Sequence, residues 1–272
     1  MAVEAFFLPV DAGRRFCLYH PPRRRTGNSA AILFVHAFAE EMNKSRRMAA
    51  LQARALAEAG HGVLQLDLLG CGDSSGDFGD AAWQSWIDDV ARGGQWLTER
   101  LGLPLWLWGH RLGCLLATAA AERLAVPANF LFWQPVVSGR QFLQQFLRLK
   151  VAGEMMSGAG QGAMERLRRQ LAEGESLEVA GYRLTPALAQ GLEAAELLPP
   201  PAPGRRLEWL EVSAREGAEL SPVARQRLEA WRQAGHEARG RVVSGPAFWQ
   251  TVEIEDCPAL LPATLVALEP AA

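Results

Sequence analysis

The sequence predicts an α/β fold built on a mostly parallel central sheet with helices on both faces. Short, nearly continuous apolar runs such as AAILFVHAF at 30–38 are typical of strands that are buried on both sides. Between them lie longer segments in which apolar residues recur at helical spacing. Repeated alternation of this kind indicates βαβ units with right-handed crossovers. The length of 272 residues suits one large domain of this class.

The expected elements follow one another from the N-terminus. Two strands flank the turn residues Asp11-Ala12-Gly13 and form a hairpin, at 3–10 and 14–22. The remaining strands are expected at 30–38, 62–67, 104–110, 128–137, 205–213 and 239–245. Helices are expected at 45–60, 79–101, 112–125 and 221–235, with a final one from about Pro258.

The alternation of strands and helices is interrupted after Val137. Residues 138–204 contain an amphipathic stretch, a piece rich in Gly, Ala and Gln, and a second apolar stretch that ends in the stiff linker PPPAPG. We expect this segment to be a helical insertion lying over the sheet rather than an independent domain. The predicted division is therefore a core of residues 1–137 and 205–272, with a helical cap insertion at 138–204.

Composition and charge exclude several classes of protein. The net charge is −2, and the only basic run, Arg23-Arg24-Arg25, lies in a turn rich in Pro, Gly and Asn, so a nucleic-acid partner is not expected. No apolar run reaches the ~20 residues of a transmembrane segment, and the N-terminus does not resemble a signal peptide. The four scattered cysteines favour reduced thiols in the cytoplasm and no metal or other cofactor.

The stretch Gly109-His110-Arg111-Leu112-Gly113 joins an expected strand to an expected helix. Small residues on both sides of a central one are typical of a nucleophile elbow, where G-x-S-x-G presents a serine at the carboxyl edge of a parallel sheet. The central position here is an arginine. The helix N-terminus behind it favours an anion at this place.

Three segments together resemble α/β-hydrolases, namely ILFVHAF, GVLQLDLLGCGDSSG and LWLWGHRLGCLLA. More narrowly, HAFAEEMNKSRRM, GHRLGCLLA and SGPAFWQT are similar to the proteins called exosortase A system-associated hydrolase 2, which are encoded beside bacterial exosortase and exopolysaccharide genes. The resemblance implies the α/β-hydrolase fold, with 138–204 at the position of the cap. It also implies hydrolysis of an ester, acyl or related bond in exopolysaccharide or protein-sorting metabolism.

The resemblance also assigns the positions of a catalytic triad, in the chain order nucleophile, acid, histidine. They fall on Arg111, on Glu216 with Glu219 as second choice, and on Phe248. Arginine stays protonated and does not attack a carbonyl, and phenylalanine does not transfer a proton. The sequence therefore predicts a degenerate triad.

Three residues are candidates to replace the missing nucleophile. Cys114 follows the turn by three residues and is expected to be a buried filler. Ser74 and Ser75 lie in a loop where the family's serine is a turn residue. A water molecule activated by a carboxylate, Asp73 or Glu216, is the remaining route to hydrolysis.

The histidines offer no convincing general base. His110 lies beside Arg111 and can line a pocket, but it is poorly aimed as a triad base. His36 matches the family's oxyanion-loop histidine, which is commonly structural. His61 and His236 precede strands at the opposite edge of the sheet and are expected on the surface.

Arg111 has two compatible interpretations. Its guanidinium can bind a ligand carboxylate or phosphate, such as a sugar acid, a phosphorylated glycan intermediate or a peptide carboxyl terminus. Alternatively it pairs internally with Glu40 or Glu41, because a buried arginine needs a partner. The candidate binding residues are His36, Phe38, Glu40, Glu41, Asp73, His110, Arg111, Leu112 and Trp249.

The tryptophans are interpreted by position. Trp106, Trp108 and Trp133 are expected in the core. Phe248 and Trp249 are expected to close the rim of the pocket, where they either stack on a sugar ring or fill the space of the missing histidine. Two functions follow from the sequence. One is a hydrolase with a degenerate triad, and the other is a non-catalytic accessory protein that binds a small or glycan-related anionic ligand at Arg111.

Overall fold

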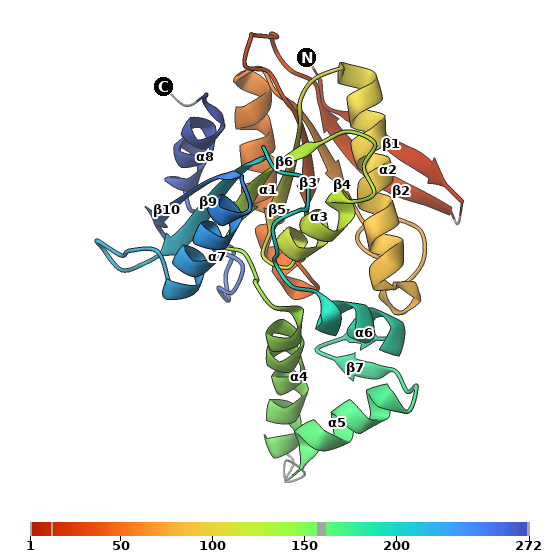
Figure 1. The fold of residues 1–272 in the computed structure, drawn as a ribbon. Coiled ribbons are helices and arrows are strands. Elements are labelled where there is room, and N and C mark those ends of the chain that lie inside the picture. The colour runs from red at the N-terminus through yellow and green to blue at the C-terminus, as the bar shows by residue number, and fades with distance from the viewer. Residues whose placement is uncertain (1, 12, 157–161, 271–272) are drawn as a thin grey trace.

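A computed structural model describes residues 2–11, 13–156 and 162–270, and it contains an eight-stranded sheet of order β1-β2-β4-β3-β5-β6-β9-β10 (Figure 1). All neighbours from β4 to β10 are parallel, while β1 and β2 pair antiparallel and β2 joins β4 antiparallel. The strands are β1 (Glu4–Val10), β2 (Gly13–His20), β3 (Ala31–Val35), β4 (Gly62–Leu66), β5 (Leu105–His110), β6 (Ala128–Trp133), β9 (Arg206–Ser213) and β10 (Glu237–Ser244). The predicted fold class is confirmed.

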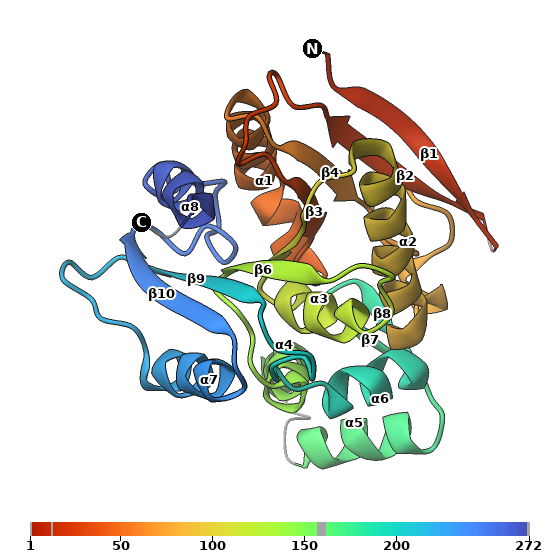
Figure 2. The same ribbon diagram turned by 45° about the horizontal axis from the view of Figure 1, so that its top comes forward.

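Helices cover both faces of this sheet (Figure 2). One face is covered by α1 (Glu40–Glu58) and α8 (Leu260–Leu268), and the other by α2 (Trp83–Leu101), α3 (Gly113–Ala121) and α7 (Pro222–Gln233). A short 3-10 turn, η1 (Phe78–Asp80), precedes α2. Strand β3 shows why its sequence is apolar throughout, since Leu33 faces the larger of two core clusters and Ile32 the smaller.

The elements between β6 and β9 project beyond the carboxyl ends of the strands (Figure 1). They are α4 (Gly139–Met156), α5 (Ala163–Ala172), the hairpin of β7 (Leu177–Val179) and β8 (Tyr182–Leu184), and α6 (Pro186–Ala194). Tyr182 attaches the hairpin to the core, because its hydroxyl donates to Glu40 at 3.2 Å and accepts from Asn43 at 3.0 Å. The sequence did not lead us to expect this hairpin, although Ala180 and Gly181, with φ of 50° and 83°, are typical of a two-residue turn.

Two expectations about local structure were wrong. Helix α1 begins at Glu40 and not at 45, because Ala39 takes φ 51° and the two acidic residues that follow are favourable in a first helical turn. His61 and His236 are buried rather than on the surface. Each accepts a backbone N–H through Nδ1 at 3.2 Å, from Ala30 and Arg205 respectively, so both stabilise segments that lead into strands.

Other expectations were confirmed. Trp106, Trp108 and Trp133 are in the core, and the triplet Arg23-Arg24-Arg25 is exposed. Within the described part of the chain, no helix is both long and apolar enough to span a bilayer.

Gly113 gives a direct test of how closely the first turn of α3 approaches the end of β3. A Cβ atom at this position would lie 2.1 Å from the carbonyl oxygen of Val35, which is backbone and has no room to move. We expect Gly113→Ala to lower the free energy of unfolding by about 3 kcal/mol or more, measured by urea denaturation.

The control is Gly153→Ala in α4. A Cβ at this position would meet no atom within 4 Å, so the change should raise the free energy of unfolding by about 0.5 kcal/mol. Equal effects of the two changes would contradict this packing.

Candidate functional site

The turn between β5 and α3 has the geometry of a nucleophile elbow. Arg111 occupies the left-handed region with φ 54°, which is unusual for a residue with a side chain. Three backbone hydrogen bonds hold it there: its N–H donates to Trp133 O at 3.0 Å, and its carbonyl accepts from the N–H groups of Cys114 and Val136 at 3.1 and 3.2 Å. Gly109 is required as well, since a Cβ there would lie 2.7 Å from the Cα of Cys114.

The side chain of Arg111 is engaged by Glu41, from the first turn of α1. Arg111 Nη2 lies 3.0 Å and Nε 3.2 Å from Glu41 Oε1, and only 13% and 18% of the two side chains are exposed. The guanidinium also lies 5.4 Å from the centre of the Trp249 ring, and its Nη1 donates to the carbonyl of Gln134 at 3.5 Å. Of the two acids considered from the sequence, Glu41 is the partner, whereas Glu40 is occupied by Tyr182 and Asn43.

The position assigned to the triad histidine is part of the core. Phe248 is completely buried, and its ring stacks on that of His110 at 5.3 Å with 14° between the planes. Trp249 is 4% exposed and packs edge-on against both rings, at 5.1 and 5.7 Å. The two side chains are therefore in the interior beside the elbow and not at an open rim. Of their two interpretations from the sequence, burial agrees with filling the space of the missing histidine and not with stacking on a sugar ring.

A buried serine and histidine lie next to each other behind the elbow. His110 Nδ1 lies 3.3 Å from the carbonyl of Trp133, and since a carbonyl only accepts, Nδ1 carries the proton and Nε2 is an acceptor. Ser45 Oγ lies 2.9 Å from Nε2 and 2.6 Å from the carbonyl of Glu41, so its one proton faces two acceptors. Burial, together with the charge of Arg111, lowers the pKa of His110 to about 3.

This pair does not form a reactive site. Ser45 and His110 are 3% and 1% exposed, so a substrate has no access to them. Sequence reasoning missed Ser45, because a serine within a helix does not by itself indicate a contact with a distant strand. A signal was nevertheless present, since the spacing of four residues between Glu41 and Ser45 places both on the same face of α1.

The space in front of the N-terminus of α3 is filled by aromatic side chains. Phe38 contacts Phe78, Trp86, Phe142 and Phe146 edge-on, with centroids 5.0 to 5.8 Å apart. The cavity that remains measures about 10 Å³, at the lower limit for one water molecule. It is lined by His36, Ala37, Phe38, Leu68, Trp86, Leu112, Gly113 and Leu116. A substrate does not fit here.

The acidic candidates are not directed at a histidine. Glu216 is exposed in the loop after β9, and Glu219 pairs with Arg225 at 3.2 Å. In the ranges that the structure describes, neither carboxylate makes a hydrogen bond to a histidine ring. The positions that the sequence resemblance assigns to a triad, 111, 216 and 248, therefore follow strands that end at one edge of the sheet, and they form no proton-transfer chain.

The alternative nucleophiles have structural roles, as expected. Ser74 donates to the carbonyl of Asp67 at 2.6 Å and accepts from the N–H of Phe16, while Ser75 accepts from the N–H of Arg14 at 3.0 Å. Cys114 is fully buried, and burial raises the pKa of its thiol well above the usual value.

His36 and Asp73 also lie at the carboxyl edge of the sheet, in the loops that follow β3 and β4. His36 is buried, donates from Nδ1 to the carbonyl of Ala37 at 2.7 Å and accepts the N–H of Leu68 at 3.4 Å, and burial lowers its pKa. Asp73 is exposed, and its N–H donates to Asp67 Oδ2 at 3.1 Å. His36 thus joins two loops, while Asp73 presents an exposed carboxylate. Across the described ranges, no group of His, Cys, Asp and Glu is arranged to hold a metal ion.

A family model described as serine aminopeptidase, S33 matches residues 26–165, which is just over half of the chain. The chain belongs to this family of α/β-hydrolases. Human protein ABHD12B is 33% identical over 115 residues, or 42% of this chain, and the match spans 30% of the length of that curated relative.

Solved structures of α/β-hydrolases superpose over nearly the whole chain. Est1E from Butyrivibrio proteoclasticus has a TM-score of 0.61 at 12% identity and covers 97% of this chain and 96% of its own. A thermostable carboxyl esterase from Bacillus coagulans has a TM-score of 0.60 at 16% identity, with 90% and 91% covered. XC6422 from Xanthomonas campestris, described as a serine hydrolase without a lid, has a TM-score of 0.57 at 16% identity, with 99% and 96% covered. At these identities the likeness shows the fold.

The family's name refers to a serine, and the elbow of this member carries an arginine in a closed ion pair. We expect Glu41→Ala to lower the free energy of unfolding by about 2 kcal/mol, because it leaves a largely buried guanidinium without its carboxylate. Glu40→Ala is the matched control, since the neighbouring exposed carboxylate should contribute less than about 1 kcal/mol. A double-mutant cycle with Arg111→Ala measures the coupling directly. Additive effects of Arg111→Ala and Glu41→Ala would contradict the pair.

The depressed pKa of His110 predicts a pH dependence of stability. In the unfolded chain the imidazole takes up a proton below about pH 6.5, whereas in the native state it stays neutral until the pH nears 3. As the pH falls through this window the unfolded state binds more protons, so the free energy of unfolding decreases, by up to about 1.4 kcal/mol per pH unit. His110→Gln should therefore show a shallower dependence than wild type between about pH 6 and 4.

Cys114→Ala is the control for this measurement, because it alters the same turn without removing a group that titrates in that window. It should shift stability by a constant amount and keep the wild-type slope. A wild-type slope in His110→Gln would show that the imidazole is not held neutral by burial.

Proposed function

We propose that this chain is a non-catalytic member of the α/β-hydrolase family that acts as an accessory protein of a bacterial exosortase and exopolysaccharide system. The observation that carries the proposal is the closed pair of Arg111 and Glu41 where a nucleophile would stand. A protonated guanidinium held by a carboxylate supplies neither a nucleophile nor a general base.

Two further features support a degenerate triad. Phe248 occupies the position of the histidine with no exposed surface, and its ring is stacked on His110. The place where an acyl group would be held is occupied by the cluster around Phe38. Restoring one residue would therefore restore neither proton transfer nor access.

The positions of three sequence motifs in the structure support the resemblance to the exosortase A system-associated proteins. HAFAEEMNKSRRM contributes Glu41 and Ser45, GHRLGCLLA contributes Arg111 and its neighbouring histidine, and SGPAFWQT contributes Phe248 and Trp249. These residues contact one another around the elbow. The three motifs thus describe a single packed cluster, which supports a function shared with the exosortase-associated proteins. The scattered, free cysteines support a cytoplasmic location.

Hydrolysis of an ester or acyl substrate is the second candidate, and membership of a hydrolase family favours it. It requires a water molecule activated by an exposed carboxylate such as Asp73 or Glu216. An anionic ligand at Arg111 is less well supported than internal pairing, because it would have to displace Glu41 from the guanidinium. The experiment below tests hydrolysis.

We expect no labelling of the wild-type protein by a fluorophosphonate probe and no turnover of short p-nitrophenyl esters above the rate of the buffer. Arg111→Ser should also be unlabelled, because no histidine lies beside position 111 with access to solvent. Labelling is measured by in-gel fluorescence and turnover by absorbance, with a serine esterase as positive control.

Turnover by wild type would overturn the proposal in favour of the hydrolase. Its loss in Asp73→Asn or Glu216→Gln would then identify the carboxylate. Esterase activity created by Arg111→Ser alone would show instead that a general base had been overlooked near the elbow.

A further inference from the structure

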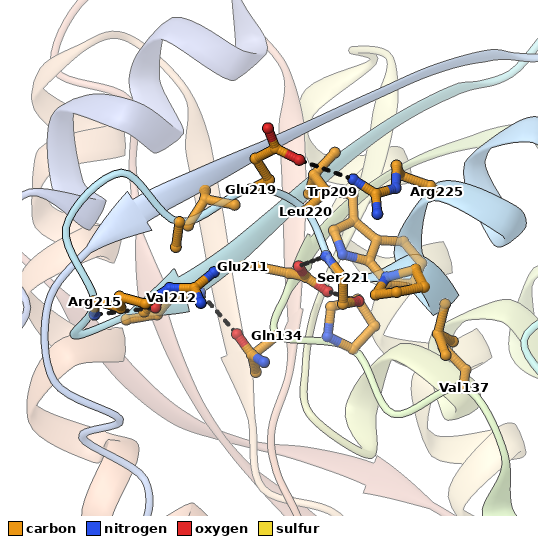
Figure 3. A pocket seen from close by; sticks show the side chains of 16 residues that line it. Gln134, Val137, Trp209, Glu211, Val212, Arg215, Glu219, Leu220, Ser221 and Arg225 are labelled. Atoms are coloured by element: carbon orange, nitrogen blue, oxygen red, sulfur yellow. Dashed lines mark hydrogen bonds and ion pairs between the residues drawn. The ribbon is translucent and has the colours of Figure 1, made fainter.

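An open cavity lies beside the turn between β5 and α3, at the ends of the next two strands of the sheet. It measures about 530 Å³ and is formed by the carboxyl ends of β6 and β9, the loop that follows β9 and the first turn of α7 (Figure 3). This volume lies in the usual range for small-molecule sites. The cavity shares no lining residue with the cluster around Phe38, so it is a separate site.

Two acidic and two basic side chains line this cavity. Glu211, from β9, accepts the N–H of Ser221 at 2.8 Å and its hydroxyl at 2.7 Å, and Glu219 pairs with Arg225 at 3.2 Å, as the dashed lines in Figure 3 show. The Glu219–Arg225 pair is weak, because 84% and 54% of its side chains are exposed. Arg215 forms no ion pair and no side-chain hydrogen bond within the described ranges, so its guanidinium is available to a ligand.

Gln134 contributes an amide to the same cavity and holds an unusual backbone conformation. Its φ is 45°, in the left-handed region, and its side-chain oxygen accepts the N–H of Val212 at 2.7 Å. The amide N–H₂ makes no hydrogen bond within the described ranges, so it is available as a donor to a ligand. Strained residues of this kind are concentrated at functional sites, so Gln134 marks this wall of the cavity as a candidate.

Apart from Ser213 and Ser221, the rest of the lining is apolar. It includes Pro135, Val137, Trp209, Leu220, Pro222, Val223 and Val242. A ligand that fits therefore combines an apolar portion with charged groups of both signs.

We propose that this cavity binds a small zwitterion with an apolar side chain, of the class of free apolar amino acids. Its carboxylate would meet Arg215 and the amide of Gln134, and its ammonium group would meet Glu211 and Glu219. The apolar walls would enclose its side chain. This inference goes beyond the proposed function and does not depend on it, because no residue of the elbow takes part.

The balance of charges decides against simpler ligands. A plain anion would approach two carboxylates, and a plain cation would approach two guanidinium groups, so each would meet repulsion as well as attraction. A neutral ligand would leave the guanidinium of Arg215 without a counter-charge. A molecule that carries both charges a few ångströms apart is the one that matches both sets.

The test uses L-leucine and two analogues that each lack one charge. Leucinamide has the ammonium group but no carboxylate, and 4-methylpentanoate has the carboxylate but no ammonium group. Binding to the full chain is measured by NMR titration or calorimetry up to ~10 mM, since an ordinary small-ligand site of this kind falls in the range of about 1 mM or tighter. We expect leucine to bind at least about tenfold more tightly than either analogue.

Variants then assign each charge to its partner. Arg215→Ala should weaken leucine binding about tenfold and leave leucinamide unchanged, and Glu219→Gln should weaken leucine and leave 4-methylpentanoate unchanged. Both residues are exposed, so the variants should fold. The control is Arg123→Ala, an exposed arginine just after α3 that does not line the cavity and should bind leucine as wild type does.

Three results would overturn the inference: no binding of leucine in this range, equal binding of leucine and leucinamide to wild type, or leucine binding that Arg215→Ala does not alter. None of them would affect the proposal that the elbow is non-catalytic. Conversely, ester turnover by the wild type would refute that proposal and leave the leucine measurements to be interpreted independently.

Discussion

The ion pair of Arg111 and Glu41 determines how the carboxyl edge of this sheet is built. A guanidinium at the elbow stays charged at every physiological pH, and most of its surface is removed from water, so the fold has to supply a counter-charge there. Helix α1 supplies it by starting early enough to include Glu41 in its first turn. The same helix then places Ser45 against His110, and His110 in turn provides the surface on which Phe248 stacks. One charge thus fixes the relative positions of α1, the elbow and the loop after β10.

The fold and the elbow could be predicted from the sequence, because both depend on local patterns. Continuous apolar runs identify the strands, and the glycines that flank Arg111 identify a turn in which the backbone passes close to a neighbouring strand. The start of α1 at Glu40 could not be predicted. Ala39 adopts a positive φ, and an alanine in the sequence does not indicate such a conformation. For Phe248 the sequence left two alternatives, an exposed rim or a filled interior. The sequence alone does not decide between them for an aromatic residue in a loop. The positions of His110 and Trp249, which pack against Phe248, decide that it is buried.

The two cavities described at the carboxyl edge of the sheet differ in their packing and in their charge. The one in front of α3 is closed by Phe38 and its aromatic neighbours, while the one beside β9 remains open and carries charged groups. Gln134 lies between them, since its carbonyl accepts from Arg111 and its side chain lines the open cavity. The open cavity was missed at the sequence level because its residues come from the ends of two strands, a loop and a helix, with no recognisable spacing among them.

The stack of Phe248 on His110 has a consequence for any attempt to engineer this chain. A histidine introduced at position 248 would place a polar ring in a fully buried site, opposite an imidazole whose nitrogens already have partners. A serine introduced at position 111 would leave Glu41 largely buried without its cation. Each change alone costs stability, and neither alone supplies both a nucleophile and a base. A serine–histidine pair at these two positions therefore requires the surrounding packing to be redesigned at the same time, rather than one residue after the other.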